Sequence, residues 1–157
     1  MLALRLYTTT SYPQFNNPLR KGQKPHPFAF SVIFLAEGLK ILKSIAAQSA
    51  DFTKERTLWR GMANMIVLEE FKQCGGTELA PMSTSASKAT AYSYAQSKVP
   101  LIFKYNVRGM TLGCSIDFLS VYPGEAEFLY APLTYICYKG ESKDGDTTVI
   151  SVEPQQA

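Results

Sequence analysis

Two glutamates one residue apart, Glu125 and Glu127, have a spacing that suits chemistry. In a strand, residues i and i+2 project from the same face. Both carboxylates can therefore enter one cleft if Glu127 opens a strand and Glu125 lies in the preceding loop. Two like charges so close raise the pKa of one group unless a cation or hydrogen bonds intervene. The pair suits a base beside a charge stabiliser, although a pair of solvated carboxylates on a turn has the same spacing.

Two earlier segments carry further polar groups, Leu58–Gly61 and Ser83–Ser85. Arg60 follows an aromatic residue in an expected strand, and its guanidinium offers a rigid fork of donors that matches phosphate. Taken alone, Arg60 is equally consistent with a surface arginine at a strand end. The hydroxyl-rich tripeptide is common, and Ser85 could cap a helix that begins near Ala86.

Three segments, in this order along the chain, resemble the arginine–serine–glutamate signature of the mono-ADP-ribosyltransferases: Leu58–Gly61, Ser83–Ser85 and Tyr122–Glu127. The resemblance extends from Leu4 to about Tyr138, so it concerns the whole domain. It implies an α+β fold of two packed, roughly perpendicular β-sheets flanked by a few helices. NAD would lie in the cleft between the sheets as a consumed substrate, with no metal required.

The resemblance also implies roles for the acidic residues. Glu127 would be the catalytic glutamate, which stabilises the positive charge that develops on the ribose when nicotinamide leaves. Glu125 would position and deprotonate the acceptor, with Tyr122 in the acceptor-recognition loop. A glutamate at the position of Glu125 favours the arginine-directed branch, because relatives that modify asparagine or cysteine usually carry glutamine there.

The remaining implied roles concern NAD itself. Arg60 would hold the dinucleotide phosphates, Gly61 would let the nicotinamide carboxamide reach the backbone, and Ser83 would orient Glu127 and contact the nicotinamide ribose. An aromatic residue on the next helix, Tyr92 or Tyr94, would stack against nicotinamide. The residues expected to bind NAD are Arg60, Gly61, Ser83, Thr84, Ser85, Tyr94 and Glu127.

The implied partners are NAD and a protein acceptor with an exposed arginine. Three alternatives stay open on the sequence: an NAD glycohydrolase that passes ADP-ribose to water, transfer to an acceptor other than arginine, and an inactive NAD-binding interaction module. Acceptors across the family are diverse, and the sequence does not choose among them.

Composition excludes several other classes. A length of 157 residues suits one domain with a core of about 4–153, either complete or excised from a larger protein. A net charge of +3 without a Lys/Arg run argues against nucleic-acid binding. Three scattered cysteines and a single histidine, the loop residue His26, give no disulfide framework and no metal site.

Membrane association is not expected, because the apolar run 28–36 is too short to span a bilayer and is followed by charged residues. The N-terminus is too short and too quickly polar for a signal peptide. These features predict a soluble, cytoplasmic protein, with a secreted effector as the alternative.

The elements that must position these residues follow from periodicity. Leu4–Thr9 is expected to be a strand and Ser11–Pro27 a loop. Apolar residues in steps of three and four from Phe28 to Ala46 predict a helix that packs across one face of a sheet. A short helix over 65–71 should end at Gly75 and Gly76, and a second helix should run over Ala86–Ser97.

Short strands account for the rest of the predicted elements. A turn is expected at Lys143–Asp146, and the tail after Glu153 is expected to fray. Several short strands with few helices, not in alternation, predict an α+β fold. The predicted strands are Thr57–Met62, Glu78–Thr84, Leu101–Val107, Glu127–Tyr130, Leu133–Tyr138 and Thr147–Val152.

Overall fold

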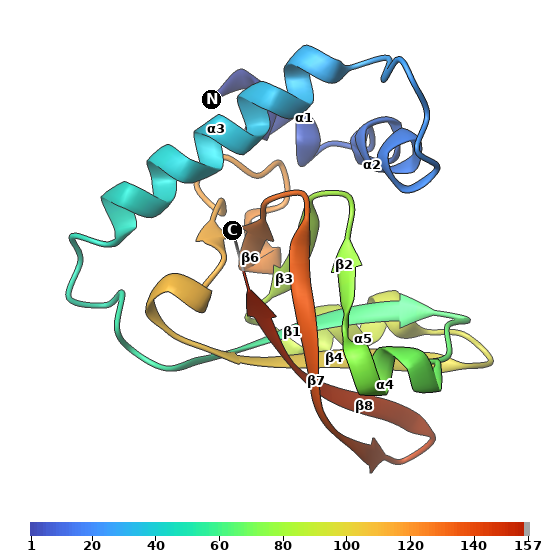
Figure 1. The fold of residues 1–157 in the computed structure, drawn as a ribbon. Coiled ribbons are helices and arrows are strands. Elements are labelled where there is room, and N and C mark those ends of the chain that lie inside the picture. Colours follow the sequence, from blue (N-terminus) through green and yellow to red (C-terminus); the bar gives the residue numbers. More distant parts are fainter. Residues whose placement is uncertain (156–157) are drawn as a thin grey trace.

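The computed structural model describes residues 1–155 as an α+β structure in which the three N-terminal helices gather at one end of a strongly bent sheet (Figure 1). The helices are α1 (Leu2–Tyr7), α2 (Tyr12–Arg20), α3 (Ala29–Ala46), α4 (Glu69–Cys74) and α5 (Lys88–Ala95). Two short 3₁₀ turns are η1 (Gly109–Thr111) and η2 (Pro123–Glu125). The strands are β1 (Arg56–Ala63), β2 (Gly76–Glu78), β3 (Met82–Ser85), β4 (Pro100–Val107), β5 (Cys114–Ser115), β6 (Glu127–Tyr130), β7 (Thr134–Asp144) and β8 (Thr147–Gln155).

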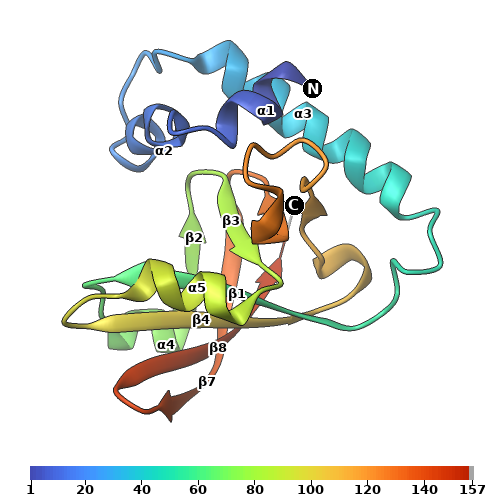
Figure 2. The same ribbon diagram turned by 180° about the vertical axis from the view of Figure 1, so that it is seen from behind.

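The strands form one ladder in the order β2-β7-β8-β4-β1-β3-β6-β5, antiparallel except for β4 and β8. The junction between β1 and β3 is narrow, with the single register pair Trp59 and Ser85. Beyond that junction β1 and β4 run crosswise to β2 and β3, as both ribbon views show (Figures 1 and 2). The two halves of the sheet therefore diverge at the point where β1 and β3 separate, and this divergence opens the space for a site.

Three apolar clusters hold these layers together. One lies on the sheet and includes Leu58, Met82, Tyr105, Tyr130 and Ile150. A second packs α1, α2 and α3 over β5 and β6 through Leu4, Tyr7, Phe15, Leu35, Leu39, Ile116 and Leu129. A third lies under α5 and consists of Ala91, Ala95, Ile102 and Val149.

Strong periodicity predicted several elements correctly. The long helix, α3, buries Leu35 and Leu39 and packs against α1 and β5 at the end of the sheet. The alternating apolar residues of β4 are buried together with Ile102, since this strand is covered on both faces. Gly75 ends α4 with a φ of 70°, a conformation that glycine adopts without strain.

The N-terminal prediction was wrong. Leu4–Thr9 is not a strand: α1 runs over Leu2–Tyr7, and its two buried residues, Leu4 and Tyr7, lie three apart on one helix face. Ser11–Pro27 is not simply a loop, because it contains α2, which begins at Tyr12 with a proline in its first turn.

The segment predicted as one strand over Glu78–Thr84 is two strands separated by a break that includes Ala80 and Pro81. The two strands diverge, because β2 pairs with β7 whereas β3 pairs with β6. The helix cap was also misassigned: Ser87, not Ser85, accepts the hydrogen bond from the backbone N–H of Thr90, at 3.2 Å. The predicted helix over 65–71 starts later, at Glu69.

The C-terminal hairpin is longer than expected. β7 continues to Asp144 and β8 to Gln155, with the turn at Gly145 and Asp146. Residues 154 and 155 are therefore part of a strand and are not frayed, and residues 156 and 157 lie outside the described chain. Within residues 1–155, no helix combines the length and the hydropathy required to cross a bilayer.

Candidate active site

A cavity of about 510 Å³ lies where β1 and β3 separate, between α1 and α2 on one side and α5 and β6 on the other. This volume is in the range that holds small molecules and cofactors. All nine residues predicted from the sequence to form a site line it, although their roles stay predictions. The lining residues are Tyr7, Thr8, Thr9, Thr10, Tyr12, Asn16, Arg20, Trp59, Arg60, Gly61, Ser83, Thr84, Ser85, Thr90, Ala91, Tyr94, Tyr122, Glu125 and Glu127.

Glu127 is the most enclosed acid of the cavity, with 7% of its surface exposed. It opens β6 directly opposite β3, and Ser83 Oγ donates a hydrogen bond to its Oε1 at 2.5 Å. Burial raises the pKa of Glu127; the hydrogen bond from Ser83 opposes this rise, and the charges of Glu125 and Asp117 add to it. The carboxylate is thus held in place by one hydroxyl in a poorly solvated position.

Glu125 stands at the end of η2, and the residue after it, Ala126, has a left-handed φ of 47°. The two glutamates therefore reach one cavity through a reversal of the backbone, not through strand alternation. Tyr94 Oη donates to Glu125 Oε1 at 2.8 Å, and Ser85 Oγ donates to the Glu125 carbonyl at 2.5 Å. Burial and the bond to Glu125 raise the pKa of Tyr94 to about 12, so its hydroxyl stays a donor.

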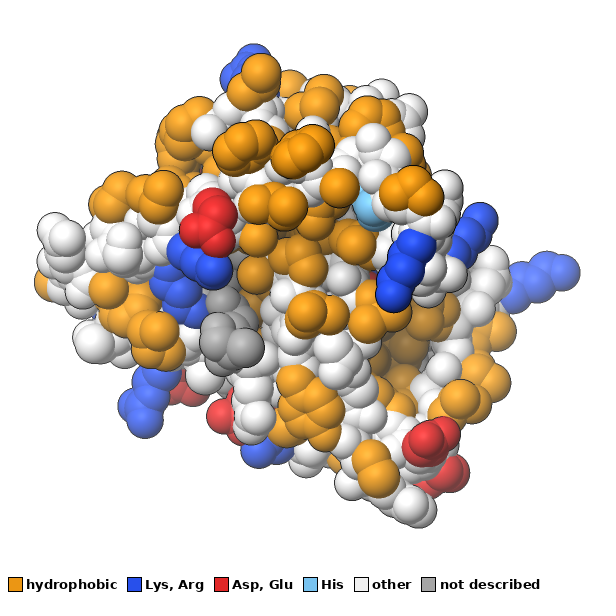
Figure 3. Space-filling model, turned by 45° about the horizontal axis from the view of Figure 1, so that its top comes forward, with side chains coloured by type: hydrophobic (Ala, Val, Ile, Leu, Met, Phe, Trp, Pro, Cys, Tyr) orange, Lys and Arg blue, Asp and Glu red, His pale blue; other side chains and the backbone are white. Residues whose placement is uncertain are grey.

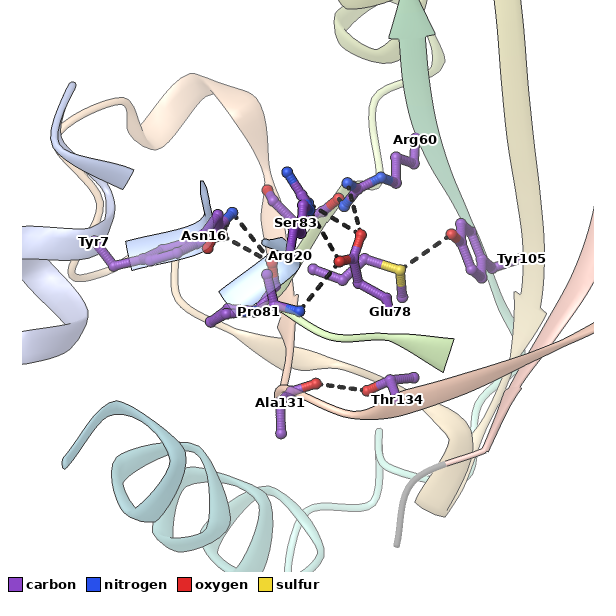
Figure 4. A network of polar contacts seen from close by, with 12 residues as sticks. Tyr7, Asn16, Arg20, Arg60, Glu78, Pro81, Ser83, Tyr105, Ala131 and Thr134 are labelled. Atoms are coloured by element: carbon purple, nitrogen blue, oxygen red, sulfur yellow. Dashed lines mark hydrogen bonds and ion pairs between the residues drawn. The ribbon is translucent and has the colours of Figure 1, made fainter. Parts of the chain in front are cut away.

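Arg60 projects from β1 and is largely enclosed, with 18% of its side chain exposed. It donates through NH1 to the Ser83 carbonyl at 3.1 Å, and its NH2 lies 3.5 Å from Glu78 Oε2 (Figure 4). These contacts exclude the alternative that Arg60 is a solvated surface arginine. Its guanidinium is fixed at the wall of the cavity beside the carbonyl of the serine that holds Glu127.

Arg20 was missed in the sequence because α2 was expected to be a loop. Its Nε and NH2 donate to the two oxygens of Glu78, each at 3.0 Å, in a two-pronged ion pair. Figure 4 shows Glu78 placed between Arg20 and Arg60. Two guanidinium groups and one carboxylate leave an excess of positive charge at this end of the cavity. The sequence feature that could have revealed Arg20 is its spacing from Asn16, since residues four apart lie on one helix face.

Asn16 is buried, with 4% of its surface exposed, and lines the cavity. Its Nδ2 donates to Tyr7 Oη at 3.1 Å and to the Pro81 carbonyl at 3.4 Å. Its Oδ1 has no hydrogen-bond partner among the residues that the structure describes. Because a buried polar atom without a partner is costly, this oxygen is an unsatisfied acceptor on a residue of the cavity wall.

The other predicted site residues differ in their packing, hydrogen bonds and exposure. Gly61 is required by packing, since a Cβ there would lie 1.8 Å from the Ala91 carbonyl oxygen on α5. Thr84 Oγ1 donates to the Phe128 carbonyl at 2.8 Å. Tyr122 is half exposed at the rim. Of the two tyrosines considered for stacking, Tyr94 lines the cavity, whereas Tyr92 is not among its lining residues and donates to Asp144 instead.

No group of three or more His, Cys, Asp or Glu side chains that could hold a metal occurs within the described part of the chain. The cavity is instead lined by two cationic side chains, Arg20 and Arg60, and by two carboxylates, Glu125 and Glu127. This arrangement suits a ligand that carries phosphate and a reacting centre that gains positive charge.

The fold is that of the ADP-ribosyltransferases. The ADP-ribosyltransferase HopU1 of Pseudomonas syringae pv. tomato DC3000 superimposes with a TM-score of 0.73 and 18% identity, over 94% of this chain and 66% of that chain. Exoenzyme S of Pseudomonas aeruginosa, solved with human 14-3-3 protein beta and carba-NAD, gives a TM-score of 0.71 and 21% identity, over 96% and 70%.

The ADP-ribosyltransferase Vis of Vibrio splendidus, solved with agmatine, gives a TM-score of 0.68 and 20% identity, over 99% of this chain and 74% of that chain. No protein-family model matches the sequence, and no curated protein matches it. The likeness therefore concerns the fold alone.

Proposed function

We propose that this chain is a single catalytic domain, an NAD-dependent mono-ADP-ribosyltransferase that transfers ADP-ribose to an arginine side chain of a protein. One observation carries the proposal: Ser83 Oγ and Glu127 Oε1 lie 2.5 Å apart in a cavity of an ADP-ribosyltransferase fold. The structure of exoenzyme S with carba-NAD and that of Vis with agmatine support a dinucleotide and a guanidine as ligands.

The cationic end of the cavity suits the diphosphate of NAD. Arg20 and Arg60 both point at Glu78, and guanidinium groups bind phosphate oxygens through paired hydrogen bonds. The unpartnered Oδ1 of Asn16 would accept a hydrogen bond from a ribose hydroxyl or an amine of the ligand.

Cleavage breaks the bond between the ribose carbon and the nicotinamide nitrogen, and the bonding electrons leave with nicotinamide. Positive charge then develops on the ribose. A fixed carboxylate at Glu127 stabilises this charge in the transition state more than in the ground state. Because burial raises the pKa of Glu127, the hydrogen bond from Ser83 serves to keep the group ionised and aimed.

Transfer forms a new bond between the ribose carbon and a guanidinium nitrogen of the acceptor, which must lose a proton. Glu125 stands toward the rim of the cavity, where it can bind the guanidinium and accept that proton. Tyr94 fixes its carboxylate, and the half-exposed Tyr122 lies in the same loop.

The test is incubation of the purified domain with labelled NAD and agmatine. Labelled agmatine supports the proposal, and free ADP-ribose alone indicates an NAD glycohydrolase. Modified protein in a lysate without labelled agmatine indicates another acceptor. Binding of NAD without any cleavage indicates an inactive module. A chelator should change nothing, since no metal is part of the proposal.

Two variants and one control make the test residue-specific. Glu127→Ala should abolish both transfer and hydrolysis, whereas Glu125→Ala should lose transfer and keep much of the hydrolysis. Glu55→Ala removes an exposed carboxylate outside the cavity and should behave as wild type. Near-normal NAD cleavage by Glu127→Ala would overturn the assignment of this residue.

A further inference from the structure

Glu78 lies between the two arginines of the proposed diphosphate site. Arg20 and Arg60 both line the cavity, whereas Glu78 is not among the described residues that line it. The Glu78 side chain is enclosed, with 17% of its surface exposed, and it contacts both guanidinium groups (Figure 4). No step of ADP-ribose transfer uses this carboxylate, so its place between two arginines calls for another explanation.

The Glu78 carboxylate is anchored independently of the arginines. The backbone of Glu78 pairs with Thr134 of β7, and its carbonyl accepts a hydrogen bond from the Leu133 N–H at 2.9 Å. Its Oε1 accepts another from the Ala80 N–H at 3.1 Å. The carboxylate is therefore fixed by its own strand and turn, and it can fix the longer arginine side chains in turn.

One oxygen of this carboxylate joins the two arginines. Glu78 Oε2 lies 3.0 Å from NH2 of Arg20 and 3.5 Å from NH2 of Arg60, although these arginines come from α2 and β1. Two positive charges brought this close repel each other, and the shared carboxylate offsets the repulsion. Glu78 thus allows two guanidinium groups to stand side by side at the cavity wall.

Glu78 also determines which donors of Arg20 remain available. An arginine has five N–H donors in a planar fork. The carboxylate takes the edge made by Nε and NH2 of Arg20, so the edge that includes NH1 remains for a ligand. Arg60 is held from two sides as well, since its NH1 donates to the Ser83 carbonyl. Both guanidinium groups are therefore oriented before an anion binds.

Without Glu78, Arg20 would resemble other cationic side chains at this end of the molecule. Figure 3 shows several Lys and Arg side chains that reach out from a largely hydrophobic surface. The Arg20 side chain is 39% exposed, so it has room to turn into solvent. An arginine in that state loses rotamer freedom when it binds an anion, and this loss weakens binding.

We propose that Glu78 is a positioning residue for the diphosphate of NAD: it holds Arg20 and Arg60 together and leaves their remaining donors for the ligand. The inference rests on the proposed function for the identity of the ligand. If Glu78 acted by its charge alone, it would repel the diphosphate, and its removal would tighten binding. Because it acts through the arginines, its removal weakens binding.

The first test is calorimetric titration with carba-NAD. Glu78→Gln keeps the shape of the side chain and removes its charge, and it should raise the Kd about tenfold, as expected when long side chains must be ordered by the ligand. Glu78→Ala should have the same effect. Glu70→Ala removes an exposed carboxylate of α4 and should bind as wild type does. Equal or tighter binding by Glu78→Gln would overturn the proposal.

A double-mutant cycle tests whether Glu78 acts through Arg20. In an Arg20→Ala background the two-pronged ion pair is already lost. Glu78→Gln should then change the Kd by less than about threefold, since residues that act as a unit are not additive. A loss of the same size in both backgrounds would contradict the proposal.

Steady-state kinetics separate positioning from damage to the fold. The diphosphate of NAD is not attached at the bond that breaks, so its contacts are similar in the ground state and the transition state. Glu78→Gln should therefore raise the KM for NAD about tenfold and leave kcat within about twofold. A variant that is partly unfolded would lose kcat at unchanged KM, and that result would overturn the proposal.

Failure of this inference and failure of the proposed function are distinguishable. Inorganic pyrophosphate carries a diphosphate without the nucleosides, and its binding should also weaken in Glu78→Gln. If wild type binds pyrophosphate in this Glu78-dependent way but does not bind carba-NAD, the role of Glu78 stands and NAD is rejected as the ligand. If wild type binds carba-NAD and Glu78→Gln binds it equally well, only the role of Glu78 is rejected.

Discussion

Ser83 and Glu127 are 44 positions apart in the chain, and their side chains meet at 2.5 Å across the β3–β6 pairing. The sheet creates this contact, because β3 and β6 run antiparallel with Ser85 opposite Glu127. The hydroxyl is thus set against the carboxylate by backbone pairing, before any ligand binds.

The first prediction concerns this hydrogen bond. Ser83→Ala removes the contact that lowers the pKa of Glu127, so the acid limb of the pH–rate profile for NAD cleavage should move to higher pH. The rate at neutral pH should fall about 10- to 100-fold, since a hydrogen bond to a charged group contributes about 1.5–3 kcal/mol. Ser93→Ala, on the exposed face of α5, is the control. An unshifted acid limb would contradict the role of Ser83.

The second prediction separates stability from activity. Burial raises the pKa of Glu127 above its ordinary value of 4.5, so the ionised group destabilises the folded state at neutral pH. Glu127→Gln should be more stable than wild type at pH 7, because it removes the buried charge, yet inactive. As pH falls through the raised pKa, the carboxyl is protonated in the folded state, and the difference should vanish. Urea denaturation at both pH values measures this; a less stable variant at pH 7 would contradict it.

The third prediction concerns Tyr94, which fixes Glu125 through a bond of 2.8 Å. Tyr94→Phe should reduce transfer to agmatine more than hydrolysis of NAD, because the bond acts on the acceptor residue. A loss of about threefold to tenfold in transfer corresponds to one hydrogen bond. Tyr92→Phe, whose hydroxyl bonds to Asp144, is the matched control. Equal losses in both activities would place Tyr94 in the NAD site instead.

The fourth prediction concerns Arg20. Arg20→Ala should weaken binding of carba-NAD about 10- to 100-fold in calorimetric titration, because charge-assisted hydrogen bonds to the diphosphate are lost. Arg20→Lys should restore little, since lysine lacks the planar fork. Stability should change little, because the ion pair with Glu78 is partly exposed. Lys21→Ala removes a neighbouring exposed charge as control, and equal affinities for Arg20→Ala and Lys21→Ala would contradict the role of Arg20.

The fifth prediction tests why position 61 is glycine. In Gly61→Ala the new Cβ would lie 1.8 Å from the Ala91 carbonyl oxygen, so α5 must move away from β1. Overpacking of this kind costs about 3 kcal/mol, measured by urea denaturation, and should also disturb Tyr94 on α5. At Gly140 an added Cβ meets nothing within 4 Å, so Gly140→Ala should be close to wild type. Similar stability of both variants would contradict the packing argument.

The sequence predicted the placement of the candidate site residues best where these residues lie on strands. Arg60, Ser83 and Glu127 lie on β1, β3 and β6 as expected, because alternation and turn residues mark these strands strongly. The sequence predicted from strand alternation that Glu125 and Glu127 face the same cavity. In the structure they do so because Ala126, the residue between them, has a left-handed backbone conformation. A single residue in that conformation leaves no periodic signal.

The N-terminal part of the cavity could not be predicted in the same way. α1 and α2 are short and are held by packing on α3 and the sheet, so local propensity says little about them. Proline at positions 13 and 18 also argued for a loop. Because these helices were not predicted, the sequence analysis did not find three cavity residues that belong to them: Tyr7, Asn16 and Arg20. It treated Glu78 only as part of a strand.

The position of β8 has a consequence for how the domain forms. This strand lies between β7 and β4, and its parallel pairing with β4 joins residues that are more than 40 positions apart. Such long-range pairing closes late in folding, because loop-closure entropy must be overcome first. Once β1, β3 and β6 have been synthesised, the growing chain contains every residue that lines the cavity. It still lacks β8, the strand that pairs with β4 and supports these residues. Until residues 147–155 pair, β4 and β7 expose open edges, so the sheet that supports the cavity is complete only after residue 155 has been synthesised.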